Sequence, residues 1–63
     1  MDMEALKAEI KKLNAKATQL KMDLHDLAED LPQGWEKIPD LAQQTYETYA
    51  KLAKAKEALK NNA

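Results

Sequence analysis

A repeat of apolar residues along the first half of the chain constrains the fold more than any other feature. The spacing alternates strictly between three and four residues, and no polar residue interrupts it. An apolar residue every 3.5 positions keeps one narrow stripe of a helix facing a neighbour. The repeat therefore predicts one long helix that packs on other helices. The members of this stripe, the seam, are Met3, Leu6, Ile10, Leu13, Ala17, Leu20, Leu24, Leu27 and Leu31.

The seam ends at a break in the helical pattern. Pro32 disfavours helical geometry at the residue before it, and Gly34 accepts a positive φ angle. We therefore expect the first helix over about residues 2–31 and a turn over about 32–37.

A second helix follows the turn. The fixed φ of Pro39 suits a first helical turn, and Asp40 places a carboxylate at the positive end of the helix dipole. Helical spacing continues to Lys60, so we expect the second helix over about 38–60, with a frayed end after it. So short a connection makes the two helices antiparallel neighbours.

The second helix is too apolar to be covered by the first alone. Ala42, Tyr46, Ala50 and Ala53 form a row beside its main stripe. A 63-residue chain without cysteine also lacks the disulfides that stabilise many small domains, which leaves oligomerisation. We predict a single all-α domain over 1–63, an antiparallel two-helix hairpin that dimerises into a four-helix bundle. The expected core and dimer residues are Leu6, Ile10, Leu13, Leu20, Leu24, Leu27, Trp35, Tyr46, Tyr49 and Leu52.

Charge is sorted along the expected rod, although the net charge is only −1. Nine lysines lie in the segments that meet at the terminal end, against four carboxylates, which gives +5. Seven carboxylates against Lys37 give the loop end −6. Loops at opposite ends of a dimer would therefore set unlike charges side by side.

One cluster has the composition of a metal site. His25 lies beside the seam, and Glu29 follows one helical turn later on the same face, so imidazole and carboxylate could share a divalent transition metal such as nickel or zinc. Asp26 offers a further carboxylate. The alternative interpretation is a solvated acidic helix end, in which His25 benefits from the negative end of the helix dipole.

Two other functions are less well supported by the residues. A Lys-rich end could contact RNA phosphates through Lys7, Lys11, Lys12 and Lys16, but the chain has no arginine among its ten basic residues, which disfavours nucleic acid as a partner. No triad-like neighbourhood surrounds the three threonines at 18, 45 and 48 or His25, and two short helices offer no deep pocket for a substrate. We expect no enzymatic activity.

The sequence has no targeting or membrane signal. Its N-terminal residues lack the cationic and apolar regions of a secretory signal, and no apolar run approaches membrane-spanning length. We expect a soluble, cytoplasmic protein without membrane contact.

Three segments of the chain resemble a known protein family. They are the run KMDLHDLAEDLP from Lys21 to Pro32, Trp35, and the TYETY segment at 45–49. The family is the Rop-like family of two-helix proteins of unknown function encoded in nitrogen-fixation gene clusters. The resemblance covers nearly the whole chain. It implies a dimerising hairpin, a bacterial cytoplasmic setting and an accessory role around nitrogenase, and a metalloprotein label attached to the family favours His25 as a ligand.

Three functions follow from these observations. The first is a non-enzymatic accessory or scaffold protein of nitrogen fixation that binds nitrogenase or a cofactor-assembly protein, with a transition metal at His25. The second is an RNA-binding hairpin dimer that uses its Lys-rich end. The third is a structural oligomerisation module without a ligand.

Overall fold

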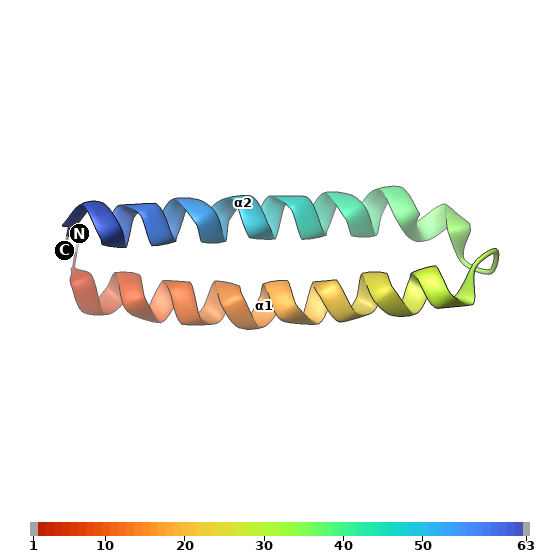
Figure 1. The fold of residues 1–63 in the computed structure, drawn as a ribbon, viewed down its shortest axis with the longest axis horizontal. Helices are drawn as coiled ribbons and strands as arrows, with labels where there is room; N and C mark the ends of the chain where they lie inside the picture. The colour runs from red at the N-terminus through yellow and green to blue at the C-terminus, as the bar shows by residue number, and fades with distance from the viewer. Residues whose placement is uncertain (1, 63) are drawn as a thin grey trace.

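The structure, a computed structural model that describes residues 2–62, is an antiparallel helical hairpin. Helix α1 spans Met3–Asp30 and helix α2 spans Ile38–Asn62, and a 3₁₀ turn, η1, spans Trp35–Lys37 between them. The two long helices lie side by side in a rod of 46 × 15 × 12 Å (Figure 1). The prediction of a two-helix hairpin is confirmed.

The helix ends follow from local chemistry. Asp2 caps α1, because its side chain accepts a hydrogen bond of 3.2 Å from the backbone N–H of Glu4. At the other end, α2 continues to Asn62, past the end expected near Lys60. No proline or glycine interrupts this segment, and the positive charge of Lys60 suits the last turn.

Gly34 reverses the chain direction between the helices. Its φ angle is +78°, in the left-handed region that glycine enters without a steric penalty. Its carbonyl accepts a 2.9 Å hydrogen bond from the N–H of Lys37, which closes the 3₁₀ turn. A Cβ atom at this position would lie 3.1 Å from Leu27 Cδ1, so the turn also packs closely on α1. The predicted role of Gly34 is confirmed.

The core of the hairpin is one line of side chains between the two helices. Only five of the described residues are buried, and four of them are apolar. Thr48 is the buried polar residue, at 4% exposure. Most other seam residues are half-buried, because two helices can enclose only the side chains that point directly at each other. The buried apolar residues are Leu6, Ala17, Leu20 and Leu52.

Every aromatic side chain of the protein is exposed in the hairpin. Tyr46 is 73% exposed, Trp35 is 63% exposed and Tyr49 is 41% exposed. Aromatic rings are usually covered in folded proteins. The hairpin alone therefore covers these three predicted core residues only in part.

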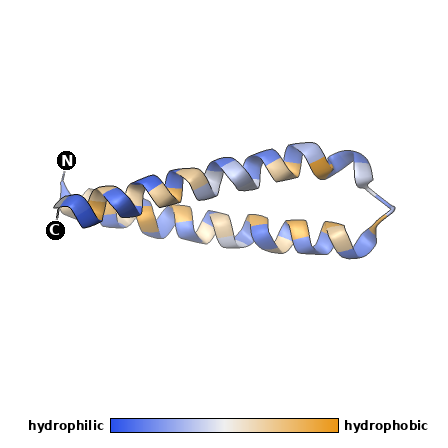
Figure 2. Cartoon of the chain, turned by 45° about the horizontal axis from the view of Figure 1, so that its top comes forward, coloured by the Kyte–Doolittle hydropathy of each residue, from blue (hydrophilic) through white to orange (hydrophobic). Residues whose placement is uncertain are grey.

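Apolar positions recur along the full length of both helices, between polar ones (Figure 2). Over the residues that the structure describes, neither helix has an apolar stretch of the length and hydropathy needed to cross a membrane.

Candidate functional site

His25 and Glu29 lie one helical turn apart near the loop end of α1. The Nε2 atom of His25 is 3.5 Å from Oε1 of Glu29. Two ligands of one tetrahedral zinc ion, with bonds of about 2.1 Å, lie about 3.4 Å apart. The observed separation therefore suits a shared cation, with water filling the remaining positions.

Asp26 approaches the other edge of the same ring. Its Oδ1 atom is 3.8 Å from Nδ1 of His25, which is too long for a hydrogen bond. One ligand atom from each of His25, Asp26 and Glu29 lies within 4.8 Å of the others, so the structure brings the three predicted residues together. The two carboxylates face different ring nitrogens, however. A cation on Nε2 would thus be shared with Glu29, while Asp26 adds a negative charge near Nδ1.

The site is exposed. The side chains of His25, Asp26 and Glu29 are 62%, 69% and 67% accessible, so any bound cation would keep much of its water. Asp23 and Asp30 add negative charge on the same helix, and α1 ends at Asp30 with the negative end of its dipole. The electrostatic environment therefore favours a cation.

The lysines proposed for phosphate contacts do not share one surface. Lys7 and Lys16 are nine residues apart in α1, which at 100° per residue places them on opposite sides of the helix. Lys11 and Lys12 are exposed between them. The set spreads over half of the helix circumference, and a groove-shaped phosphate site would need these charges closer together on one side.

The charge sorting is slightly less complete than the sequence indicated. The midpoint of α1 falls between Lys16 and Ala17, so Lys21 lies in the loop half of the rod. With Lys21 counted there, the terminal half carries +4 and the loop half −5. The molecule still has oppositely charged ends.

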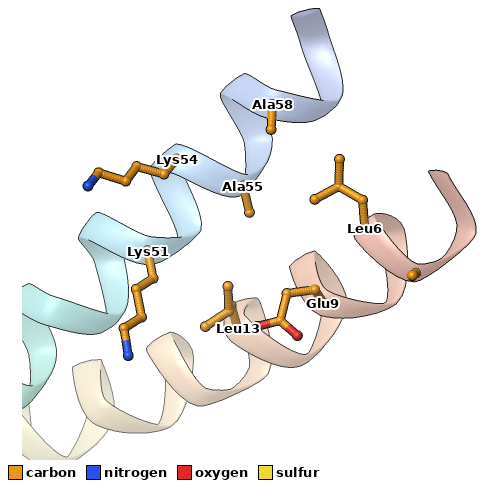
Figure 3. Close-up of a pocket in the computed structure, with 8 residues that line it drawn as sticks. Leu6, Glu9, Leu13, Lys51, Lys54, Ala55 and Ala58 are labelled. Carbon is orange, nitrogen blue, oxygen red and sulfur yellow. The ribbon is translucent and has the colours of Figure 1, made fainter. Parts of the chain in front are cut away.

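A groove runs between the helices at the terminal end, and we call it the terminal groove. Its volume is about 570 Å³, and it exists because short alanine side chains meet there (Figure 3). Glu9, Lys51 and Lys54 bring charge to its lining. The apolar pattern of the sequence did not predict this groove, although alanines that flank the seam on one side were a signal for it. The residues that line it are Ala5, Leu6, Glu9, Leu13, Lys51, Lys54, Ala55 and Ala58.

The opposite side of the hairpin carries the aromatic residues. At 100° per residue, Tyr49 and Tyr46 lie about 60° and 120° to one side of the buried Leu52, whereas Ala55 and Ala58 of the terminal groove lie at the same angles to the other side.

On α1, Leu24 and Ala28 lie about 40° and 80° to one side of the buried Leu20, whereas Glu9 of the terminal groove lies about 60° to the other side of the buried Leu6. A shallow hollow of about 170 Å³ joins this part of α1 to Ile38 of α2. We call the resulting surface the aromatic face. It comprises Leu24, Ala28, Leu31, Ala42, Tyr46, Tyr49 and Ala53.

Comparison with known proteins relates the whole chain to one family. A family model described as Rop-like matches residues 1–63. A UPF0437 protein of Azorhizobium caulinodans is 56% identical over 59 residues, which cover 94% of this chain and 86% of the relative.

A protein of Frankia alni is 55% identical over 53 residues, 84% of this chain and 65% of the relative, and is named as a UPF0437 protein in the nifX-nifW intergenic region. The NMR structure of a structural-genomics target is 54% identical, with a TM-score of 0.90 over 97% of this chain and 86% of the other.

Proposed function

The chain belongs to the Rop-like family, and from that premise we propose that it is a non-enzymatic accessory protein of nitrogen fixation that acts in the cytoplasm by binding. The observation that carries this proposal is the position of the Frankia alni relative, in the nifX-nifW intergenic region. Genes for proteins that act on one process are often grouped. The partner we propose is nitrogenase or a protein that assembles its cofactor.

Affinity capture from nitrogen-fixing cells tests this context. The full chain carrying an affinity tag should recover nitrogenase or a cofactor-assembly protein from these cells. Cells grown on ammonium, in which nitrogen fixation is repressed, provide the control. Equal recovery of unrelated proteins under both conditions would contradict the proposal.

A divalent transition metal at His25 and Glu29 is the second part of the proposed function. It is supported by the 3.5 Å separation of Nε2 and Oε1, which fits two ligands of one ion, and by the surrounding carboxylates. The binding would be reversible, because one imidazole and one exposed carboxylate leave most ligand positions to water. Such a site suits transient handling of nickel or zinc better than permanent storage.

The hairpin is proposed to act as a dimer that forms a four-helix bundle. The exposed aromatic rings and the single line of buried side chains support this, since an isolated pair of helices leaves much of its apolar surface in water. A structural oligomerisation module without a ligand would form the same dimer. It would show no metal-induced NMR shifts when a divalent metal is added.

The alternative function is RNA binding through the Lys-rich end of the hairpin. Phosphate contacts predict an affinity that falls steeply with salt, whereas coordination by His25 does not. The distribution of Lys7 and Lys16 on opposite sides of α1 favours the metal proposal.

A further inference from the structure

The terminal groove is a part of the surface that neither the metal site nor the dimer uses. Leu6 and Leu13 of α1 point across it toward Ala55 and Ala58 of α2, and the short alanine side chains leave the space between them open (Figure 3). Leu6 is 4% exposed, whereas Leu13 and both alanines are half-buried. The groove therefore has an apolar floor that water still reaches in part, and covering such a surface is favourable.

We propose that the terminal groove receives an amphipathic helix of the partner protein, with apolar residues on its floor and carboxylates along the flank that faces Lys51 and Lys54. This inference rests on the proposed function, in which the chain acts by binding, and adds the docking surface and the chemistry of the partner. Helices laid in apolar grooves are a recurrent mode of recognition, anchored by residues spaced i, i+4 and i+7.

The length of the groove suits two turns of a helix. Its α1 wall runs from Ala5 to Leu13, which is about 12 Å at a helical rise of roughly 1.5 Å per residue. Residues i and i+7 of a docked helix are about 10 Å apart, so both reach the floor. The alanines on the α2 wall let a third helix approach to the short end of the usual range of interaxial distances, about 8–10 Å.

The open shape of the groove suits a helix better than a small molecule. Small-molecule sites cover most of the surface of their ligand. Ala5 and Glu9, on the α1 wall, are exposed, so a small apolar molecule bound here would keep much of its surface in water. A docked helix instead turns its own polar side toward the solvent.

The charges around the groove favour an acidic flank on the partner helix. Within the span of the groove and on its side of the hairpin, three lysines stand against one carboxylate, that of Glu9, which gives a net charge of +2. These lysines are Lys12, Lys51 and Lys54. Lys51 and Lys54 are exposed, and neither forms an ion pair within residues 2–62. Carboxylates on the partner would be attracted during approach and paired after docking.

A second copy of the chain has no apolar ridge that would fill the groove. On the groove side, α2 continues toward the loop with Asp40, Gln44 and Glu47, which are polar and exposed. Two copies packed by this side would place these residues over the groove if their loops lay at opposite ends. With the loops at the same end, Lys51 of one copy would meet Lys51 of the other. The groove also lies opposite the aromatic face, so a dimer that covers the tyrosines leaves it open.

Two synthetic peptides of about 20 residues, above the length at which isolated helices are marginal, provide the probes. Both carry leucines at i, i+4 and i+7. One flank of this stripe is glutamate in the acidic peptide and lysine in the basic peptide. Fluorescence anisotropy with the full chain, at about 0.15 M salt, should show that the acidic peptide binds about fivefold more tightly or better.

Filling the groove tests its position. Ala55→Leu places a leucine where the partner helix would lie, whereas Ala8→Leu makes the same change at an exposed position on the back of α1, in the same half of the rod. Ala55→Leu should weaken binding of the acidic peptide about tenfold or more. Ala8→Leu should change it by less than about twofold. Circular dichroism should show both variants as helical as the wild type, because leucine is a good helix former and residue 55 borders open space.

Reversing one charge tests the chemistry of the partner. Lys51→Glu cancels the net charge at the groove, so this variant should bind the two peptides with affinities within about twofold of each other. Lys11→Glu changes the total charge equally but lies on the back of α1, and it should keep the preference for the acidic peptide.

Three results would overturn the inference. They are equal binding of the two peptides by the wild type, no binding of either at high micromolar concentration, and equal effects of Ala55→Leu and Ala8→Leu. If sedimentation shows that Ala55→Leu weakens the dimer and anisotropy shows no effect on the peptide, a second copy fills the groove and the inference is wrong.

Affinity capture from nitrogen-fixing cells separates this inference from the proposed function. If Ala55→Leu recovers the same nitrogen-fixation proteins as the wild type, the groove is not the docking surface, and the proposed function stands. If the wild type recovers none of them, the proposed function fails, and the two peptides still report whether the groove takes an acidic helix.

Discussion

Glu29 and Asp26 lie near different nitrogen atoms of the His25 imidazole. We therefore expect the two carboxylates to contribute unequally to metal binding. Glu29 faces Nε2 and Asp26 faces Nδ1. Titration with Zn²⁺ followed by NMR should therefore show that His25→Ala abolishes the metal-induced shifts at residues 22–29. Glu29→Gln should weaken binding more than Asp26→Asn does, because only Glu29 is placed as a ligand.

Two further measurements accompany this titration. Affinity should fall as the pH is lowered from about 7 to 5, since a proton competes with the metal for imidazole. The free energy of unfolding should change by at most about 1 kcal/mol in His25→Ala, because the side chain is exposed. Unchanged shifts in His25→Ala would show that the ligand assignment is wrong.

Gly34 is the residue on which the chain reversal depends most. Gly34→Ala should lower the free energy of unfolding by about 1–2 kcal/mol, because an L side chain is strained at a φ angle of +78°. The added Cβ would also lie 3.1 Å from Leu27 Cδ1, so that side chain would have to move. Urea denaturation measures the loss, and Gln33→Ala, at the exposed preceding position, is the control. Equal midpoints for the two variants would contradict this role.

At the scale of the helices, two leucines distinguish the hairpin core from the aromatic face, Leu20 within α1 and Leu31 directly after its last residue. Leu20 is 7% exposed and Leu31 is 41% exposed. Leu20→Ala should cost about 2–4 kcal/mol of unfolding free energy at every protein concentration, because it opens a cavity between α1 and α2.

Leu31→Ala should cost about 1 kcal/mol or less in dilute solution, where the hairpin is alone, and more as the concentration rises and a second copy covers the face. Urea denaturation of both variants at two concentrations checks this. A cost of Leu31→Ala that is independent of concentration would mean that nothing docks there.

The amino-acid sequence predicted the helices and the turn more fully than it predicted the side-chain contacts between the two helices. The seam and the signals at Pro32, Gly34 and Pro39 were sufficient to predict both helices, the turn and their antiparallel pairing, because each acts within a few residues of itself. The proximity of His25 and Glu29 also followed from the spacing within one helix.

Other features depend on how the second helix is rotated against the first. Spacing alone did not indicate that Thr48 would be buried while the neighbouring Tyr49 would be exposed, because both residues lie close to the side of α2 that faces α1. The terminal groove likewise arises only where Ala55 and Ala58 of one helix meet Ala5 of the other. Such features require the relative rotation of two elements, which no local pattern encodes.

At the scale of the whole molecule, the sorted charges make association sensitive to salt. The dissociation constant of the dimer should rise several-fold as salt is raised to about 1 M, where charges more than about 3 Å apart are screened. Burial of tyrosine and leucine should still hold a dimer together, since apolar association does not weaken in salt. Sedimentation across the salt series measures this. An affinity that increases with salt would indicate like charges in contact and would contradict opposed loops.

The hairpin also brings the beginning of α1 and the end of α2 to the same tip of the rod (Figure 1). In two copies joined with their loops opposed, these tips point outward at the two ends of the bundle. A fluorescent protein fused to either end of the chain would thus be carried at the same place, and two such fusions would be held apart by roughly the 46 Å of the rod. The paired hairpins would act as a short rigid spacer of fixed length, which energy transfer between the fused fluorophores can measure.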